Sequence, residues 1–222
     1  MRHCPNPDCV IKVGDGRGFI VVNRVKLPLL KRHLKHLTRK LFVDHRLVVT
    51  AAHCLPHLHP AHASAYFFER TYKGLLGSLD GSKKDVWAQC LFIDPVADIA
   101  VLGCPDEQEL GDEADAYSSL TNGVSFLRIG RAKSGRGWVL SLDGHWIRST
   151  LKMFSGGGLS IDPIEAGMSG SPILNATGRA IGVVAIGAET ISVSGERKNE
   201  RAGPQPILGR NLPGWLLQSR AI

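Results

Sequence analysis

The chain has 222 residues, 43% of them hydrophobic, which fits one large globular domain or two smaller packed halves. It has no apolar run of the roughly 18 residues that a membrane-spanning helix needs. Charged side chains interrupt the N-terminal region where a secretory signal needs an apolar stretch. The five cysteines are few for a chain of this length, and their number is odd. We therefore expect no membrane span, and a cytoplasmic protein with reduced cysteines.

The formal net charge of +7 comes from one segment. Between Asp15 and Asp44 there is no acidic residue, and the basic residues are Arg17, Arg24, Lys26, Lys31, Arg32, Lys35, Arg39 and Lys40. Leu30, Leu34, Leu37 and Leu41 recur there at helical spacing. The segment is either a solvated insertion, as an amphipathic helix or a long hairpin, or a binding surface at Arg24–Lys40 for an anionic partner. No Phe, Trp or Tyr is interleaved with the charges between Arg24 and Lys40, which argues against single-stranded nucleic acid.

Residues 1–13 are predicted to be an N-terminal extension that is broken by prolines. Cys4 and Cys9 could pair with each other or contribute to a metal site with one of the histidines at positions 53, 57, 59 and 62. The chain has no CxxC pair, so we predict neither a metal ion nor a cofactor.

Short apolar and β-branched runs, separated by turn residues, predict an all-β protein. In chain order the expected strands are Gly18–Val22, Leu47–Thr50, Ala65–Phe68, Val86–Ile93, Ile99–Leu102, Val124–Ile129, Gly137–Leu142, Trp146–Leu151 and Ala180–Ile186. Asp143-Gly144 is a strong hairpin signal between two of them. The acidic stretch Asp106–Asp115 lacks apolar periodicity and is predicted to be an exposed connection between two halves. Leu212–Leu217 is predicted to be a closing helix.

Three motifs stand in order along the chain. His53 follows a predicted strand within Thr50–Cys54, and Asp98 immediately precedes the apolar run 99–102. In Gly167–Pro172, glycines flank Ser169 and let the backbone turn sharply, so that N–H groups point into one space. Each motif alone has an ordinary structural explanation. Together they supply the nucleophile, the base and the orienting carboxylate that acyl transfer by a serine requires.

This order, with the signatures TAAHC, DIAVL and GMSGSP, resembles the chymotrypsin/trypsin-like serine peptidases, and more closely their bacterial trypsin-like peptidase-domain branch. The resemblance extends from about Gly14 to Leu217. It implies two packed six-stranded antiparallel β-barrels with a short C-terminal helix. The first barrel would span residues 14–115, with the basic insertion at about 24–41, and the second residues 116–222.

The resemblance also implies roles for individual residues. Ser169 would be the nucleophile, His53 the general acid and base, and Asp98 the carboxylate that orients His53. The backbone N–H groups of Gly167 and Ser169 would form the oxyanion hole. Weaker candidates lack the motif context, namely Asp94 beside Pro95, Ser171 beyond the glycine, and His57, His59 and His62 in a proline-broken loop.

The chain departs from the family pattern at two positions. Digestive members have an aspartate before the serine, which pairs with a new amino terminus after activation. Here Met168 stands at that position, so the oxyanion loop must be ordered in another way or be ordered already. In secreted members the cysteine after the histidine forms a disulfide with a cysteine in the preceding strand. Gly14–Ile20 has none, so Cys54 is expected to be a free, buried thiol.

The specificity pocket is predicted from Pro163, Ile164, Ala185 and Gly187. Pro163 stands where trypsin-like specificity would place an acid, and Asp162 could replace it only if the loop shifted by one residue. We therefore expect a small or medium apolar residue before the scissile bond. The sequence predicts a serine endopeptidase that acts through an acyl-enzyme. The alternative is a protease-fold binding module, or a latent peptidase, that docks anionic partners through the basic segment.

Overall fold

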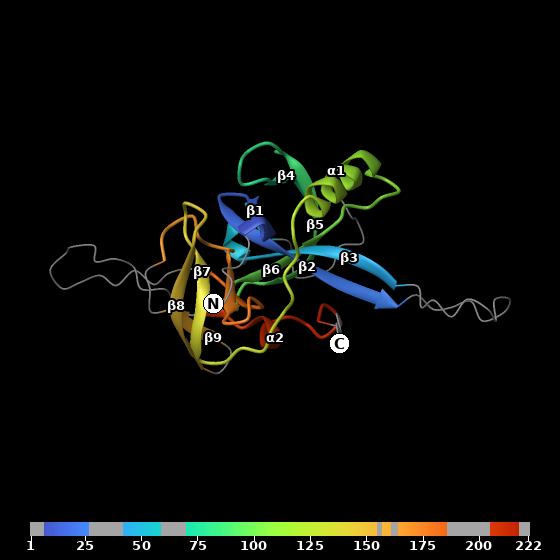
Figure 1. Ribbon diagram of the computed structural model, residues 1–222. Coiled ribbons are helices and arrows are strands. Elements are labelled where there is room, and N and C mark those ends of the chain that lie inside the picture. The colour runs from blue at the N-terminus through green and yellow to red at the C-terminus, as the bar shows by residue number, and fades with distance from the viewer. Residues whose placement is uncertain are drawn as a thin grey trace.

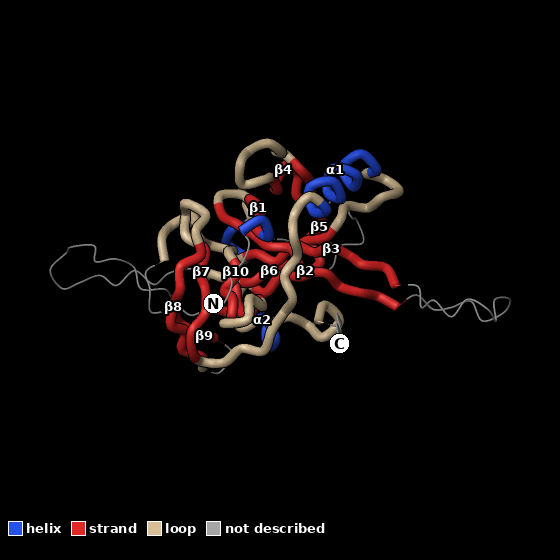
Figure 2. The backbone as a smooth tube through the Cα atoms, in the orientation of Figure 1, coloured by secondary structure: helices blue, strands red, loops and turns tan. Residues whose placement is uncertain are grey.

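The structure is a computed structural model of the 222-residue chain, and it describes residues 7–26, 42–58, 70–154, 157–160, 164–185 and 205–217. Figure 1 shows one group of strands, β1 to β6, beside a second group that includes β7, β8 and β9. The same view coloured by secondary structure shows that strands and loops make up most of the chain (Figure 2). None of the helices in the described part of the chain has the length and apolarity needed to span a bilayer.

The first group is a closed antiparallel barrel with the strand order β1-β2-β3-β6-β5-β4. Its strands are β1 (Val10–Val13), β2 (Gly16–Lys26), β3 (Phe42–Thr50), β4 (Thr71–Gly77), β5 (Val86–Asp94) and β6 (Ile99–Gly103). Pairing of β1 with β4 closes the barrel.

The second group is a six-stranded antiparallel sheet with the order β11-β10-β7-β8-β9-β12. Its strands are β7 (Gly135–Leu140), β8 (Trp146–Met153), β9 (Gly157–Ser160), β10 (Pro172–Asn175), β11 (Ala180–Val183) and β12 (Gln205–Pro206). A bridge between Gly182 and Ile207 brings its two ends together, so that the sheet is a nearly closed barrel. A short helix, α2 (Leu208–Asn211), follows. The predicted pair of six-stranded antiparallel barrels is confirmed.

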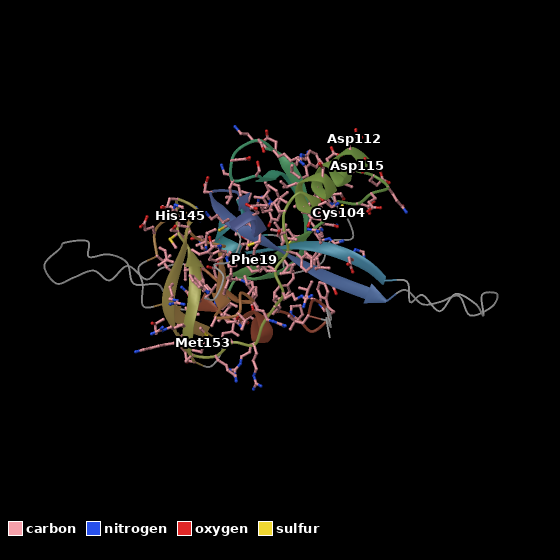
Figure 3. All side chains as sticks on the ribbon, in the orientation of Figure 1. Phe19, Cys104, Asp112, Asp115, His145 and Met153 are labelled. Carbon is pink, nitrogen blue, oxygen red and sulfur yellow. The ribbon has the colours of Figure 1, made fainter. Side chains whose placement is uncertain are left out.

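The segments 18–21 of β2, 47–50 of β3 and 99–103 of β6 are buried on both faces, which explains their continuous apolar runs. Alternate residues such as Ile20, Val48 and Leu102 fill the first barrel, and their neighbours point to the interface between the barrels. Phe19, labelled near the centre of Figure 3, belongs to this interface together with Leu140 and Leu174 of the second barrel. These strands therefore hold the two halves together.

The structure corrects the sequence analysis at the ends of the barrels. β1 is a barrel strand with buried Val10, Ile11 and Val13, whereas residues 1–13 were predicted to be an extension. The acidic connection contains a helix, α1 (Gly111–Asn122), which crosses the predicted boundary at 115/116 and buries Ala114 and Tyr117. Its acidic Asp112 and Asp115 face outward (Figure 3).

Two further predictions are also corrected. Val124–Ile129 forms only single bridges, to β2 and to Ala180, because its apolar side chains pack against the barrels without a continuous strand partner. The closing helix lies earlier, at α2, and 212–217 forms turns instead. The predicted strand 65–68 and most of the basic insertion, at 27–41, lie outside the described residues. β2 and β3 pair as far as Lys26 and Phe42, on either side of that insertion.

Candidate active site

The strand register of the first barrel brings the first two motifs together. Thr50 of β3 lies opposite Ala100 of β6. His53 follows β3 in the short turn Ala52–Cys54, and Asp98 immediately precedes β6. His53 Nδ1 lies 2.7 Å from Asp98 Oδ2, and the backbone N–H of His53 donates to Asp98 Oδ1 at 3.0 Å. The carboxylate therefore holds both the ring and the main chain of His53.

This double contact determines which ring nitrogen is available for chemistry. An ionised carboxylate only accepts hydrogen bonds, so Nδ1 of His53 carries the proton that it donates to Asp98. Nε2 of the neutral ring is then the proton acceptor. Asp98 has a φ of +53°, in the left-handed region that costs most residues about 1–2 kcal/mol but that aspartate adopts more readily. Its two hydrogen bonds to His53 stabilise that conformation.

Several neighbours change the pKa of His53. The hydrogen bond with Asp98 raises the pKa most, and the contact with the Cys54 thiol raises it further, while partial burial lowers it. The net pKa lies above the usual value for histidine. Raising the pKa makes Nε2 a stronger proton acceptor, but it also means that the neutral ring forms only at higher pH.

The serine loop adopts the sharp turn that its glycines indicated. Gly167 and Gly170 have φ values of +91° and +80°, which favour glycine over any residue with a Cβ. The amides of Met168, Gly170 and Ser171 donate to carbonyls of residues 165, 184 and 168. Within the described part of the chain, the N–H groups of Gly167 and Ser169 have no acceptor. These two amides are therefore available to an anionic oxygen, and their role as an oxyanion hole stays a prediction.

His53, Gly167 and Ser169 line one cavity of about 550 Å³, together with residues of β4 and the β1–β2 turn. No hydrogen bond joins Ser169 Oγ to His53 Nε2 among the described residues. Contacts of this kind are often long before substrate binds. His53 and Ser169, far apart in sequence, thus share one open site, and Asp98 is joined to it through its hydrogen bonds with His53.

Two residues at which the sequence departs from the family pattern are buried beside this site. Cys54 is free, as predicted, and a Cβ added at Gly16 would overlap its Sγ. The Met168 side chain is 2% exposed and packs in the core of the second barrel, with Ile173 and Val184 among its neighbours. The Met168 sulfur also accepts the N–H of Glu165 at 3.2 Å. An apolar anchor therefore occupies the position of the aspartate in digestive relatives.

The weaker candidates have other roles. Ser171 is fully buried, and its hydroxyl has no hydrogen-bond partner among the described residues. Asp94 accepts the backbone N–H groups of Val96 and Ala97 in a turn. The His57 ring packs against Tyr72. In the described ranges, no three His, Cys, Asp or Glu side chains are arranged to hold a metal ion.

The predicted specificity pocket is described only in part. Ile164 and Ala185 are buried and do not line the cavity that contains Ser169. Residues 163 and 187 lie outside the described residues, so the predicted apolar preference stays a prediction.

Sequence reasoning missed the contacts that join the two barrels at the serine. The Thr50 hydroxyl is fully buried and donates to the carbonyl of Arg17 at 2.7 Å. The N–H of Arg17 donates to the carbonyl of Ser169 at 2.8 Å. Gly170 packs directly on this junction, since a Cβ there would overlap the Arg17 carbonyl oxygen. Only the small residues of the serine motif hinted at such a close approach.

The fold and the shared cavity define a two-barrel protein with a histidine, an aspartate and a serine at one site. Residues 41–183 match the family model of the trypsin-like peptidase domain. This match covers more than half of the chain, and the chain belongs to that family. It is therefore placed among the serine peptidases, which are hydrolases.

Solved structures of other proteases are similar at low identity. A human pathogenic astrovirus serine protease is 15% identical, with 96% of this chain and 98% of that chain covered and a TM-score of 0.47. The Rv3671c protease in its inactive form is 16% identical, with 92% and 85% covered and a TM-score of 0.48. The HtrA-type protease AlgW with a decapeptide is 14% identical, with 91% and 61% covered and a TM-score of 0.44. Likeness at this level carries no information on activity. No curated protein sequence matches the chain.

Proposed function

We propose that the protein is a serine endopeptidase that cleaves peptide bonds through an acyl-enzyme intermediate. The observation that carries this proposal is that His53, paired with Asp98, lines the same cavity as Ser169. Two unpaired amides beside the serine support it further, because the reaction develops negative charge on the carbonyl oxygen of the substrate.

In the proposed reaction, Ser169 Oγ attacks the carbonyl carbon of the scissile bond while His53 Nε2 takes its proton. The carboxylate of Asp98 stabilises the imidazolium that forms. The N–H groups of Gly167 and Ser169 donate to the oxyanion. When the C–N bond breaks, His53 gives its proton to the leaving amine. Water then attacks the ester with His53 again as base, which releases the acid and restores Ser169.

Peptide turnover by the wild type and by Ser169→Ala tests this proposal. Loss of the nucleophile should reduce kcat by about 10⁶, by analogy with other serine peptidases. Ser171→Ala is the matched control, because this buried neighbour should retain turnover. Equal turnover by wild type and Ser169→Ala would contradict the proposed role of Ser169.

We further propose a small or medium apolar residue before the scissile bond. Pro163, at the position where trypsin-like specificity would place an acid, supports this preference. Cleavage of a peptide library tests this preference, and dominant cleavage after lysine or arginine would contradict it.

The binding-module alternative rests on the basic segment Arg24–Lys40. It predicts a well-folded protein that takes up no fluorophosphonate and binds DNA, RNA or anionic vesicles in a salt-dependent way. Absence of binding at low salt would leave the segment a surface insertion. A cytoplasmic location stays part of the proposal, supported by the reduced state of Cys9, Cys54, Cys90 and Cys104, and fractionation tests it.

A further inference from the structure

Arg17 has a buried side chain, and its backbone is hydrogen-bonded to the serine loop. Its residue is only 8% exposed, which is unusual for arginine. Its guanidinium donates from Nη1 to the Ser141 carbonyl at 2.7 Å and from Nη2 to the Leu142 carbonyl at 2.8 Å. Burial lowers the pKa of Arg17, and the nearby carboxylate of Asp143 opposes that shift. The charge is therefore held by two carbonyl dipoles of one turn.

That turn is the hairpin between β7 and β8, which His145 marks in Figure 3. The Ser141 hydroxyl accepts the His145 N–H and contacts Asp143, so the turn is internally hydrogen-bonded. A Cβ built on Gly167 would lie 3.2 Å from Leu142 Cδ2. The hairpin that Arg17 holds thus rests against Gly167, one of the two residues with a free amide.

Arg17 therefore acts on the serine loop from two directions. Its backbone N–H binds the carbonyl of Ser169 directly. Its side chain binds the hairpin, which in turn covers Gly167. We propose that Arg17 is a positioning residue, which orders the oxyanion loop by pinning the β7–β8 hairpin against Gly167. This inference rests on the proposed function, because the loop is argued to bind the oxyanion.

The presence of Met168 before Ser169 explains why the serine loop needs a positioning residue such as Arg17. Since Met168 and not a carboxylate stands immediately before Ser169, that position offers no side chain for an ion pair. Met168 anchors the loop in the second barrel, the Arg17 backbone binds Ser169, and the Arg17 side chain holds the hairpin whose Leu142 lies beside Gly167. The loop is then ordered without cleavage of the chain.

Arg17→Met tests the side chain alone, because it keeps the methylene packing and the backbone contacts and removes both guanidinium hydrogen bonds. We expect kcat to fall about 10–100-fold, less than the 10²–10³ that loss of a whole oxyanion donor costs. The KM should change little, because ground-state binding does not use the loop. Arg17→Lys should lose less, and added methylguanidinium should restore part of the kcat of Arg17→Ala.

Arg46→Met is the matched control. Arg46 also donates to two carbonyls, those of Thr121 and Val124, but at the first barrel and away from the serine. Amide hydrogen exchange should increase around 167–171 in Arg17→Met and remain unchanged there in Arg46→Met. Equal kcat and equal loop exchange in the two variants would overturn the inference. If the wild type shows no turnover, the proposed function fails, and the exchange comparison alone decides whether Arg17 orders the loop.

Discussion

Gly170→Ala should destabilise the junction between the two barrels. Gly170 has a φ of +80°, and a Cβ there would overlap the Arg17 carbonyl oxygen and lie 2.6 Å from Thr50 Oγ1. A left-handed φ costs alanine about 1–2 kcal/mol. Relief of the overlap must separate Gly170 from Arg17, which breaks the Thr50–Arg17 and Arg17–Ser169 hydrogen bonds. Each contributes about 0.5–1.5 kcal/mol, so the expected loss is about 2–5 kcal/mol in total.

Gly178→Ala is the matched control for this substitution. Its φ is +76°, and no atom lies within 4 Å of an added Cβ, so it should lose only the backbone cost of about 1–2 kcal/mol. Urea unfolding at equilibrium measures both free energies, and the rate of fluorophosphonate labelling measures the effect at Ser169. Gly170→Ala should be the less stable and the slower to label. Equal stabilities and equal labelling rates would refute the close packing of the junction.

Three further predictions concern the same surroundings. Met168→Ala should lower the free energy of unfolding by about 2–5 kcal/mol, and Met168→Leu should lower it by less than about 1.5 kcal/mol. Urea unfolding measures both values, and a larger loss for Met168→Leu would contradict the burial of Met168. Gly16→Ala should lower the free energy of unfolding, because the added Cβ would overlap Cys54 Sγ, and Cys54→Ala should restore part of that loss in the double variant. Strictly additive changes in the free energy of unfolding would contradict the contact. Turnover should fall as pH drops through the pKa of His53, because the protonated ring cannot accept the serine proton. Cys54→Ala should move this acid limb of kcat/KM to lower pH, since the Cys54 contact raises that pKa; an unchanged or higher limb would contradict it.

The sequence predicted the elements whose patterns are local. The segments 18–21 of β2, 47–49 of β3 and 99–102 of β6 are apolar on both faces, so their runs were visible without knowledge of the fold. β4 was missed because a register shift between Tyr72 and Leu76 breaks its alternation, with Gly74 at a φ of +62°. The helix α1 was missed because its acidic first turn hid the buried face of Ala114 and Tyr117.

In the candidate site, too, the sequence revealed the residues that stand in local motifs and missed the one that acts through distant contacts. His53, Asp98 and Ser169 stand in short motifs, each readable where it occurs, and the strand register brings the first two together. Arg17 had no such signal. Its acceptors on the β7–β8 hairpin lie 124 and 125 residues away, and in the sequence it was one of eight basic residues in a charged segment. Contacts of that range depend on how the barrels pack, which no local pattern encodes.

The residue that a fluorophosphonate labels is the most direct test of whether Ser169 is an activated nucleophile. The native protein would be treated with a fluorophosphonate, digested, and searched by mass spectrometry for the modified residue. We expect a single adduct on Ser169, lost in Ser169→Ala and strongly slowed in His53→Ala, with Ser171 unmodified. An adduct on another residue, or none on folded protein, would contradict the claim that Ser169 is an activated nucleophile.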